Sequence, residues 1–169
     1  MFKGFLSSPY LSECLLTYDI VYAIDTNSIK TKSGLFVSVG CAMEIDDFYQ
    51  KVKNRETKLT IICRETMFAH REIQLGEKLS LIGLISLILK EKISKNPDLK
   101  VGIVTDHDLG NIDKYNSRKI PILNSLYLPE NIKLIYASAD KKNASFLNQL
   151  MSMCDKRATE ILNRLNLPK

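Results

Sequence analysis

The sequence contains no uninterrupted run of about 18 apolar residues, the length that a helix needs to cross a membrane. It also has no internal repeat, no low-complexity tract and no stretch that is typical of an inter-domain linker. The opening MFKGFLSSPYLSECLL has one lysine and an apolar stretch interrupted by Ser, Pro and Glu, and no lipidation motif follows. These absences exclude a membrane span and favour a soluble cytoplasmic protein.

Several short catalytic motifs are missing as well. There is no GxGxxG, no P-loop, no GxSxG and no HExxH, so dinucleotide-binding folds, serine hydrolases and zincins lose support. The four cysteines form no CxxC pair, and only two histidines are present to assist them as zinc ligands. We expect three buried thiols within apolar runs, in a reducing compartment. The cysteines are Cys14, Cys41, Cys63 and Cys154.

What is present fits one globular domain. The chain has 169 residues, of which 45% are apolar and 25% charged. Lys and Arg number 24 against 19 Asp and Glu, which leaves a net charge of +5. This mildly basic balance favours a polyanionic partner such as nucleic acid.

The first half of the chain is rich in β-branched and aromatic stretches that predict three strands. Residues 1–17 form a lead-in segment, in which Leu11–Leu16 fits a short helix, and one domain is expected to span 18–169. Polar turn residues separate the first two strands, and a charged loop or short helix over Asp46–Glu56 separates the second from the third. Such short connections favour an antiparallel meander. The predicted elements are strand Tyr18–Asp25, turn Thr26–Gly34, strand Leu35–Ile45 and strand Lys58–Glu65.

The apolar spacing then changes to three and four residues, which predicts a long helix over Gln74–Ser94. A strand–helix–strand order implies a right-handed crossover and parallel pairing. The remaining predictions are strand Leu99–Thr105, a short helix within Asp106–Lys119, a helical or irregular Ile120–Tyr127, strand Ile132–Ala137 and helix Ser145–Leu165. The predicted fold is therefore α/β, a five-stranded mixed sheet of three antiparallel strands and then two parallel ones, flanked by helices.

Four acidic residues occupy key positions in these predicted elements. Asp25 closes the first predicted strand and Asp106 closes the fourth, while Glu77 opens the long helix and Asp155 lies inside the last. If the first and fourth strands are neighbours, Asp25 and Asp106 meet and repel each other unless they share a cation. Hard oxygen ligands without a Cys or His set suit Mg²⁺ or Mn²⁺.

In these segments the sequence resembles the ribonuclease H family and the wider ribonuclease H-like nuclease superfamily, from Tyr18 to about Leu165. The segments that carry the resemblance are YAIDTNS, HREIQLGEKLSLIGLISLILKE, VGIVTDHD and NQLMSMCDKRATEIL. The resemblance implies that two divalent ions bind to Asp25, Glu77, Asp106 and Asp155. It also implies endonucleolytic hydrolysis of the RNA strand of RNA/DNA hybrids, leaving 3′-hydroxyl and 5′-phosphate ends.

The sequence departs from the family pattern at several positions. Glu72 is an alternative to Glu77 as the helix ligand, although Ser80, one turn after Glu77, would let that glutamate approach the sheet. No glycine follows Asp25, and Asp108 stands where an amide is common. The loop Ser138–Ala144 lacks the assisting histidine, which leaves His107 as a weak candidate. These departures affect the recognition of RNA/DNA hybrids more than they affect the metal site.

Substrate contacts require basic and hydroxyl-bearing residues around this acidic centre. The candidate substrate-binding residues are Asn27, Ser28, Lys114, Arg118, Lys119, Lys141 and Lys142.

Two alternative functions stay open. One is a DNA-directed nuclease of the same fold, and the other is a non-catalytic ribonuclease H-like module that binds nucleic acid or protein.

Overall fold

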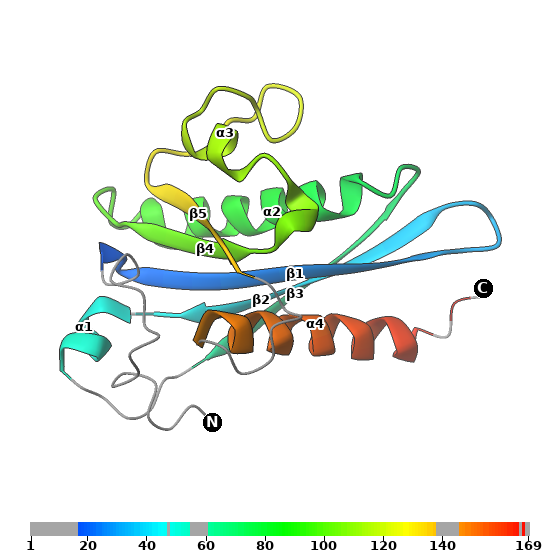
Figure 1. Ribbon diagram of the computed structural model, residues 1–169, viewed down its shortest axis with the longest axis horizontal. Helices are drawn as coiled ribbons and strands as arrows, with labels where there is room; N and C mark the ends of the chain where they lie inside the picture. The colour runs from blue at the N-terminus through cyan, green and yellow to red at the C-terminus, as the bar shows by residue number, and fades with distance from the viewer. Residues whose placement is uncertain (1–16, 47, 55–60, 138–145, 166, 168–169) are drawn as a thin grey trace.

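The computed structural model describes residues 17–46, 48–54, 61–137, 146–165 and 167 (Figure 1). The expected helix Leu11–Leu16, the start of the expected third strand, the loop Ser138–Ala144 and the candidate residues Lys141 and Lys142 lie outside these ranges. Within them, no helix is both long enough and apolar enough to cross a bilayer.

Five strands form one mixed sheet in the order β3-β2-β1-β4-β5. The three N-terminal strands pair antiparallel, whereas β4 pairs parallel to β1 and β5 pairs parallel to β4. This confirms the predicted α/β fold class and the predicted sheet. The strands are β1 (Ile20–Lys30), β2 (Phe36–Ile45), β3 (Ile62–His70), β4 (Val101–Thr105) and β5 (Ile132–Tyr136).

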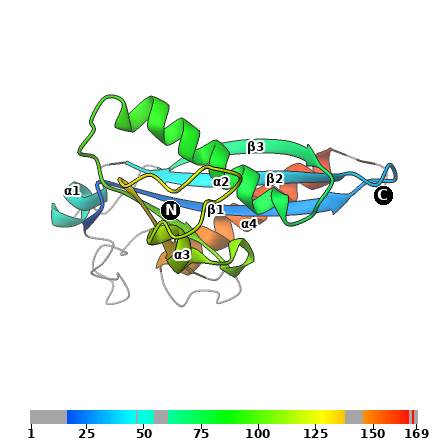
Figure 2. The same ribbon diagram turned by 90° about the horizontal axis from the view of Figure 1, so that it is seen from above.

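Helices cover both faces of the sheet, α2 on one side and α4 on the other (Figures 1 and 2). Side chains alternate along β1, so that Tyr22 and Ile24 join the core beneath α2, while Val21 and Ala23 join the core beneath α4. The helical segments are α1 (Phe48–Lys53), α2 (Leu75–Ile88), the π-helical turn η3 (Leu89–Ile93), the 3₁₀ turn η4 (His107–Leu109), α3 (Ile112–Asn116) and α4 (Phe146–Arg164). Residues 120–127 are irregular.

Strand β1 is longer than predicted. It runs on past Asp25 to Lys30, and Thr26–Gly34 is therefore not one turn; only its last residues leave the strand. The polar residues after Asp25 stay extended because β2 pairs with them as far as Lys30↔Phe36. Parallel pairing with β4 ends much earlier, at Ala23↔Val104. Asp25 thus lies within a strand, but beyond the point where its neighbour β4 stops.

Strand β3 also continues beyond its predicted end at Glu65, because β2 pairs with it up to Phe36↔His70. It is an edge strand, and this corrects one expectation about the cysteines. Cys63 is exposed on β3, with its Sγ 3.3 Å from that of Cys41, whereas Cys41 and Cys154 are buried free thiols as expected. Cys14 lies outside the described residues.

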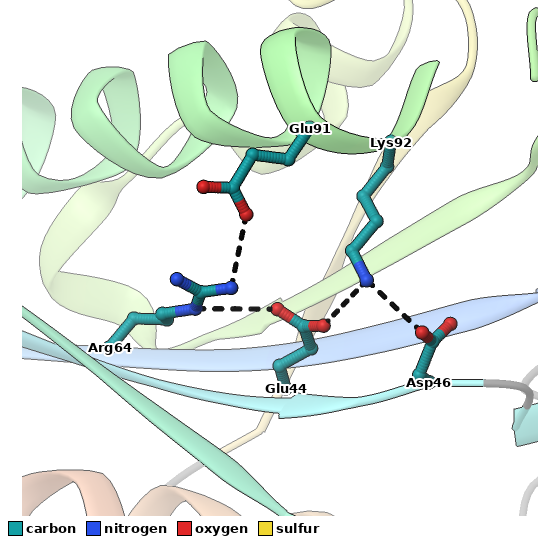
Figure 3. Close-up of polar contacts among 5 residues, drawn as sticks. All are labelled: Glu44, Asp46, Arg64, Glu91 and Lys92. Carbon is teal, nitrogen blue, oxygen red and sulfur yellow. Dashed lines mark hydrogen bonds and ion pairs between the residues drawn. The ribbon is translucent and has the colours of Figure 1, made fainter. Parts of the chain in front are cut away.

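A buried carboxylate connects the sheet to the end of the long helix (Figure 3). The side chain of Glu44 on β2 is fully buried, and its carboxylate lies 2.9 Å from Lys92 Nζ and 3.7 Å from Arg64 Nε. Lys92 also pairs with Asp46 at 3.1 Å, and Arg64 with Glu91 at 3.0 Å. Since Lys92 and Glu91 belong to η3, this network holds the C-terminal end of the helical segment on the sheet.

Candidate metal centre

Three carboxylates from three different elements meet at the end of the sheet where β4 stops. They belong to Asp25 on β1, Glu77 in the first turn of α2 and Asp106 directly after β4. One oxygen from each of the three lies within 4.8 Å of the others. Residues separated by as many as 81 positions are thereby brought to a single point that could hold a cation.

The unequal lengths of β1 and β4 bring the two aspartates together. Pairing stops at Ala23↔Val104, so Asp25 lies next to the place where the chain leaves β4 and Asp106 begins the next turn. Asp106 caps η4, and its Oδ1 accepts a hydrogen bond of 3.0 Å from the backbone N–H of Asp108. This cap fixes one Asp106 oxygen and orients the carboxylate.

Glu77 reaches the aspartates because small residues let α2 approach the sheet. A Cβ atom on Gly76 would meet the side chains of Ser38 and Ser28, and one on Gly40 would lie 2.5 Å from the Ser80 hydroxyl oxygen. Ser80 lies one turn after Glu77, and its close contact with Gly40 is the approach to the sheet that was expected of this small residue. Of the other small residues in this helix, Ser86 is exposed and does not face the sheet.

Glu72, the alternative helix ligand, is exposed and precedes α2. Its carboxylate accepts a 3.4 Å hydrogen bond from the Gln74 amide. Among the described residues, the carboxylate group that meets at the sheet edge contains Glu77 and not Glu72.

The closeness of these acids shifts their protonation. Burial, and then the charge of Asp106, raises the pKa of Asp25 to about 7. Burial, and then the charges of Asp106 and Asp25, raises the pKa of Glu77 to about 8. Asp108 adds to both shifts. Without a counter-charge, these two acids therefore retain protons at a pH where exposed carboxylic acids are ionised.

Asp155 stands beside this group on α4. The side-chain amide of Asn27 donates hydrogen bonds to its Oδ1 at 2.9 Å and to its backbone oxygen at 3.2 Å. The same amide nitrogen lies 2.9 Å from Thr159 Oγ1. Asp155 contributes to the raised pKa of Asp25, but its carboxylate is not among the three that meet. The structure thus brings three of the four expected acids together and holds the fourth through Asn27.

A hollow of about 280 Å³ adjoins Glu77. Its polar lining comes from β1, from the residues before α2 and from η4. The residues that form it are Thr26, Ser28, Ile73, Gln74, Glu77 and Asp108. Gln74 and Ile73 were not expected from the sequence, since nothing in their spacing predicts that they flank a site.

The expected basic residues fall into three groups. Lys114 and Lys119 are exposed and follow η4. Arg118 instead donates hydrogen bonds to the backbone oxygens of Asn116 and Pro129, at 3.1 and 2.8 Å, so its guanidinium holds the chain between α3 and β5. Lys141 and Lys142 are not described.

A second hollow, of about 400 Å³, lies between η4, α3 and β5. Lys114 contributes to its lining, together with the stacked rings of His107 and Tyr136, whose centroids are 3.7 Å apart. His107 is therefore engaged in an aromatic contact next to Asp106.

No protein-family model matches the chain, and no curated protein matches it in sequence. Solved structures do match in fold. The foamy viral protease-reverse transcriptase in complex with dsDNA superposes with a TM-score of 0.57 at 15% identity, over 86% of this chain and 94% of that one. The PFV RNase H domain gives 0.54 at 13%, over 85% and 93%.

A further structure, the foamy viral protease-reverse transcriptase in complex with an RNA/DNA hybrid, matches with a TM-score of 0.53 at 14% identity. The match covers 90% of this chain and 21% of that chain, so this chain spans about a fifth of the longer one. At such low identities the shared property is the fold, which is ribonuclease H-like.

Proposed function

We propose that this protein is a two-metal-dependent endonuclease that hydrolyses phosphodiester bonds, acting on the RNA strand of RNA/DNA hybrids. The observation that carries the proposal is the meeting of Asp25, Glu77 and Asp106 within 4.8 Å at the edge of a ribonuclease H-like sheet. Burial and neighbouring carboxylates raise the pKa of Asp25 and of Glu77, and ionising acids in such a place is costly for the fold unless a cation binds there.

The donor set fits Mg²⁺ or Mn²⁺. All three convergent groups offer carboxylate oxygen, the ligand that these hard cations prefer, and neither Cys nor His belongs to the described group. In the proposal, Asp25, Glu77, Asp106 and Asp155 would together hold two ions. Bound there, the ions would lower the pKa of a water and stabilise the departing 3′ oxygen.

The chain's own residues have positioning roles. The hydrogen bond from the Asp108 backbone N–H to Asp106 Oδ1 holds the Asp106 carboxylate in one orientation. Asn27 lies on β1, and its hydrogen bond to the Asp155 carboxylate sets the orientation of that side chain on α4. Loss of any one carboxylate should therefore be severe, because catalysis of this kind depends on placement and charge neutralisation.

The substrate in the proposal is nucleic acid laid along the hollow beside Glu77. Lys114 and Lys119 are exposed and available for phosphates, and Lys141 and Lys142 are proposed to join them. Arg118 is left out, since its guanidinium is engaged by two carbonyl oxygens. The fold neighbours were solved with dsDNA and with an RNA/DNA hybrid, which supports a nucleic-acid partner.

The experiment that tests this function compares four labelled substrates of one sequence: an RNA/DNA hybrid, duplex DNA, duplex RNA and a four-way junction. Each is incubated with Mg²⁺ or Mn²⁺ and with the Asp106→Asn variant as control. Cleavage of the hybrid alone, lost in the variant, is expected. Cleavage of DNA alone would contradict the proposal and favour a DNA-directed nuclease. If none of the four substrates is cleaved, the proposal is wrong and a non-catalytic binding module is favoured.

A further inference from the structure

Two thiols on neighbouring strands lie in direct contact. Cys41 is on β2 and Cys63 is on β3, and their Sγ atoms are 3.3 Å apart. The register pairs Cys41 with Glu65 and Cys63 with Met43, so the two cysteines are diagonal neighbours. Diagonal side chains on one face of an antiparallel pair come within reach of each other. The contact therefore follows from the strand register. We call Cys41 and Cys63 the β2–β3 thiol pair.

The two members of the pair differ in their access to solvent. Cys41 is 0% exposed and belongs to the core beneath α4, whereas Cys63 is exposed on the edge strand. A dissolved reagent can therefore reach Cys63 but not Cys41. Cys154 is also buried, and its thiol donates a 3.3 Å hydrogen bond to the backbone oxygen of Ala23. Among the described cysteines, Cys63 is thus the point of entry and Cys41 is the thiol in contact behind it.

The surroundings keep both thiols of the pair protonated. Burial, and then the hydrogen bond with Cys41, raises the pKa of Cys63 to about 12. Glu65, whose carboxylate lies 3.8 Å from Cys63 Sγ, adds to this shift, and Arg157 opposes it. The pKa of Cys41 is raised as well, first by its hydrogen bond with Cys154 and then by burial. Because neither thiolate is stabilised, a disulfide between them should form slowly and resist reduction once formed.

We propose that Cys41 and Cys63 form an oxidative cross-link site, at which a small disulfide such as oxidised glutathione converts the pair into an intramolecular disulfide. The Cys63 sulfur attacks one sulfur of glutathione disulfide, and the glutathione that leaves takes up the proton that Cys63 loses. The Cys41 sulfur then attacks Cys63 in this mixed disulfide, and its proton leaves with the second glutathione. Two electrons pass from the cysteines to glutathione, and no other reactant is needed.

The position on an edge strand makes the cross-link feasible. A disulfide bond is about 2.05 Å long, so the two sulfurs must approach each other by about 1.3 Å. In the sheet β3 pairs with β2 alone, so β3 can follow such a shift without breaking a second ladder. The bond would join β3 to β2 next to Glu65, which holds Arg157 of α4 at 2.6 Å. It would also close the loop between the two cysteines and so restrict the unfolded chain.

The test incubates the full chain at pH 8 in glutathione buffers of increasing oxidised fraction, until no further change occurs. Peptide mapping by mass spectrometry without reduction is expected to find Cys41 joined to Cys63, and dithiothreitol should reverse the link. The cross-linked protein should unfold several degrees above the reduced protein. Cys63→Ala should lose both the link and the shift. Cys14→Ala is the matched control and should keep them.

Cys63→Ala removes an exposed side chain, so this variant should unfold like the reduced wild-type protein, and a missing link is then not a failure to fold. A link from Cys41 to Cys154, or a glutathione that stays on Cys63, would overturn the assignment of the pair. A Cys41–Cys63 link that leaves the unfolding temperature unchanged would overturn its role in holding β3. None of these measurements uses nuclease activity, so their outcome is independent of the proposed function.

Discussion

The side-chain amide of Asn27 donates a 2.9 Å hydrogen bond to the carboxylate of Asp155 and so connects β1 to α4 at the edge of the candidate metal centre. Because the amide also bonds the Asp155 backbone oxygen, it fixes both the helix and the side chain. The fourth expected metal ligand is thus held in place by a residue two positions after the first.

Asn27→Ala should therefore lower activity without removing any carboxylate. With Asp155 free to turn to solvent, we expect kcat on the hybrid to fall about tenfold, equivalent to about 1.4 kcal/mol of transition-state stabilisation. Steady-state cleavage at saturating Mg²⁺ measures it. Asn163→Ala, an exposed asparagine on the same helix, is the matched control and should behave like wild type. Equal kcat in the two variants would remove Asn27 from the site.

Asp25→Asn should separate activity from stability. The amide cannot replace a ligand shared by two cations, so we expect cleavage to fall about a thousandfold. It also removes a buried charge that repels Asp106, so the metal-free protein should unfold at a higher temperature at pH 8. Thermal unfolding in EDTA checks the second effect, with the exposed Asp98→Asn as control. An active or destabilised Asp25→Asn protein would contradict the electrostatic reasoning.

The metal-free protein should lose stability as the pH rises. The pKa values of Asp25 and Glu77 are raised from 3.8 and 4.5 to about 7 and about 8, so the folded state holds these protons more tightly than the unfolded state. Their contribution is complete below about pH 4 and is lost as the pH rises to 8. In EDTA we expect unfolding at pH 8.5 several degrees below that at pH 5.5.

Two additions make this pH dependence specific to the site. Excess Mg²⁺ should restore much of the lost stability at pH 8.5, since a bound cation stabilises the ionised acids. The double variant Asp25→Asn/Glu77→Gln should show a flatter pH profile in EDTA. A wild-type profile that Mg²⁺ leaves unchanged, or a double variant with the wild-type slope, would mean that the acids do not govern the effect.

Lys92→Met should destabilise the fold far from the metal centre. Among the described residues, it leaves the fully buried Glu44 carboxylate with the more distant Arg64, at 3.7 Å, as its remaining ion-pair partner (Figure 3). Breaking a buried pair in this way costs about 3–5 kcal/mol, which urea unfolding measures. Lys90→Met, on the same η3 turn but exposed, should cost little. Adding Glu44→Gln to Lys92→Met should recover stability, because it removes the uncompensated charge.

The order and pairing of the strands could be predicted because they depend on local patterns. β-branched and aromatic stretches, short connections and the change to helical spacing from Gln74 predict three antiparallel strands and then parallel ones. The end of β1 could not be predicted, because the polar residues after Asp25 remain extended through their pairing with β2. Strand length here is a property of the sheet and not of the segment.

The candidate site shows the same division. Asp25, Glu77 and Asp106 follow from the element order, and the structure brings them together. The hydrogen bond between His70 Nε2 and Ser38 Oγ could not be predicted, since it depends on the β2–β3 register. Arg118 illustrates the opposite case: its charge suggested phosphate binding, yet its positive φ of 54° and two carbonyl partners turn it toward the protein.

The central claim is that the carboxylates at the sheet edge hold divalent cations, and a crystal structure with Mn²⁺, using anomalous scattering at the manganese edge, tests it most directly. The account predicts two peaks about 3.5–4 Å apart, between Asp25 and Asp106, with Glu77 and Asp155 on opposite sides. Both peaks should vanish in the Asp106→Asn variant. Carboxylates that remain without anomalous density at millimolar Mn²⁺, or peaks that persist in the variant, would contradict it.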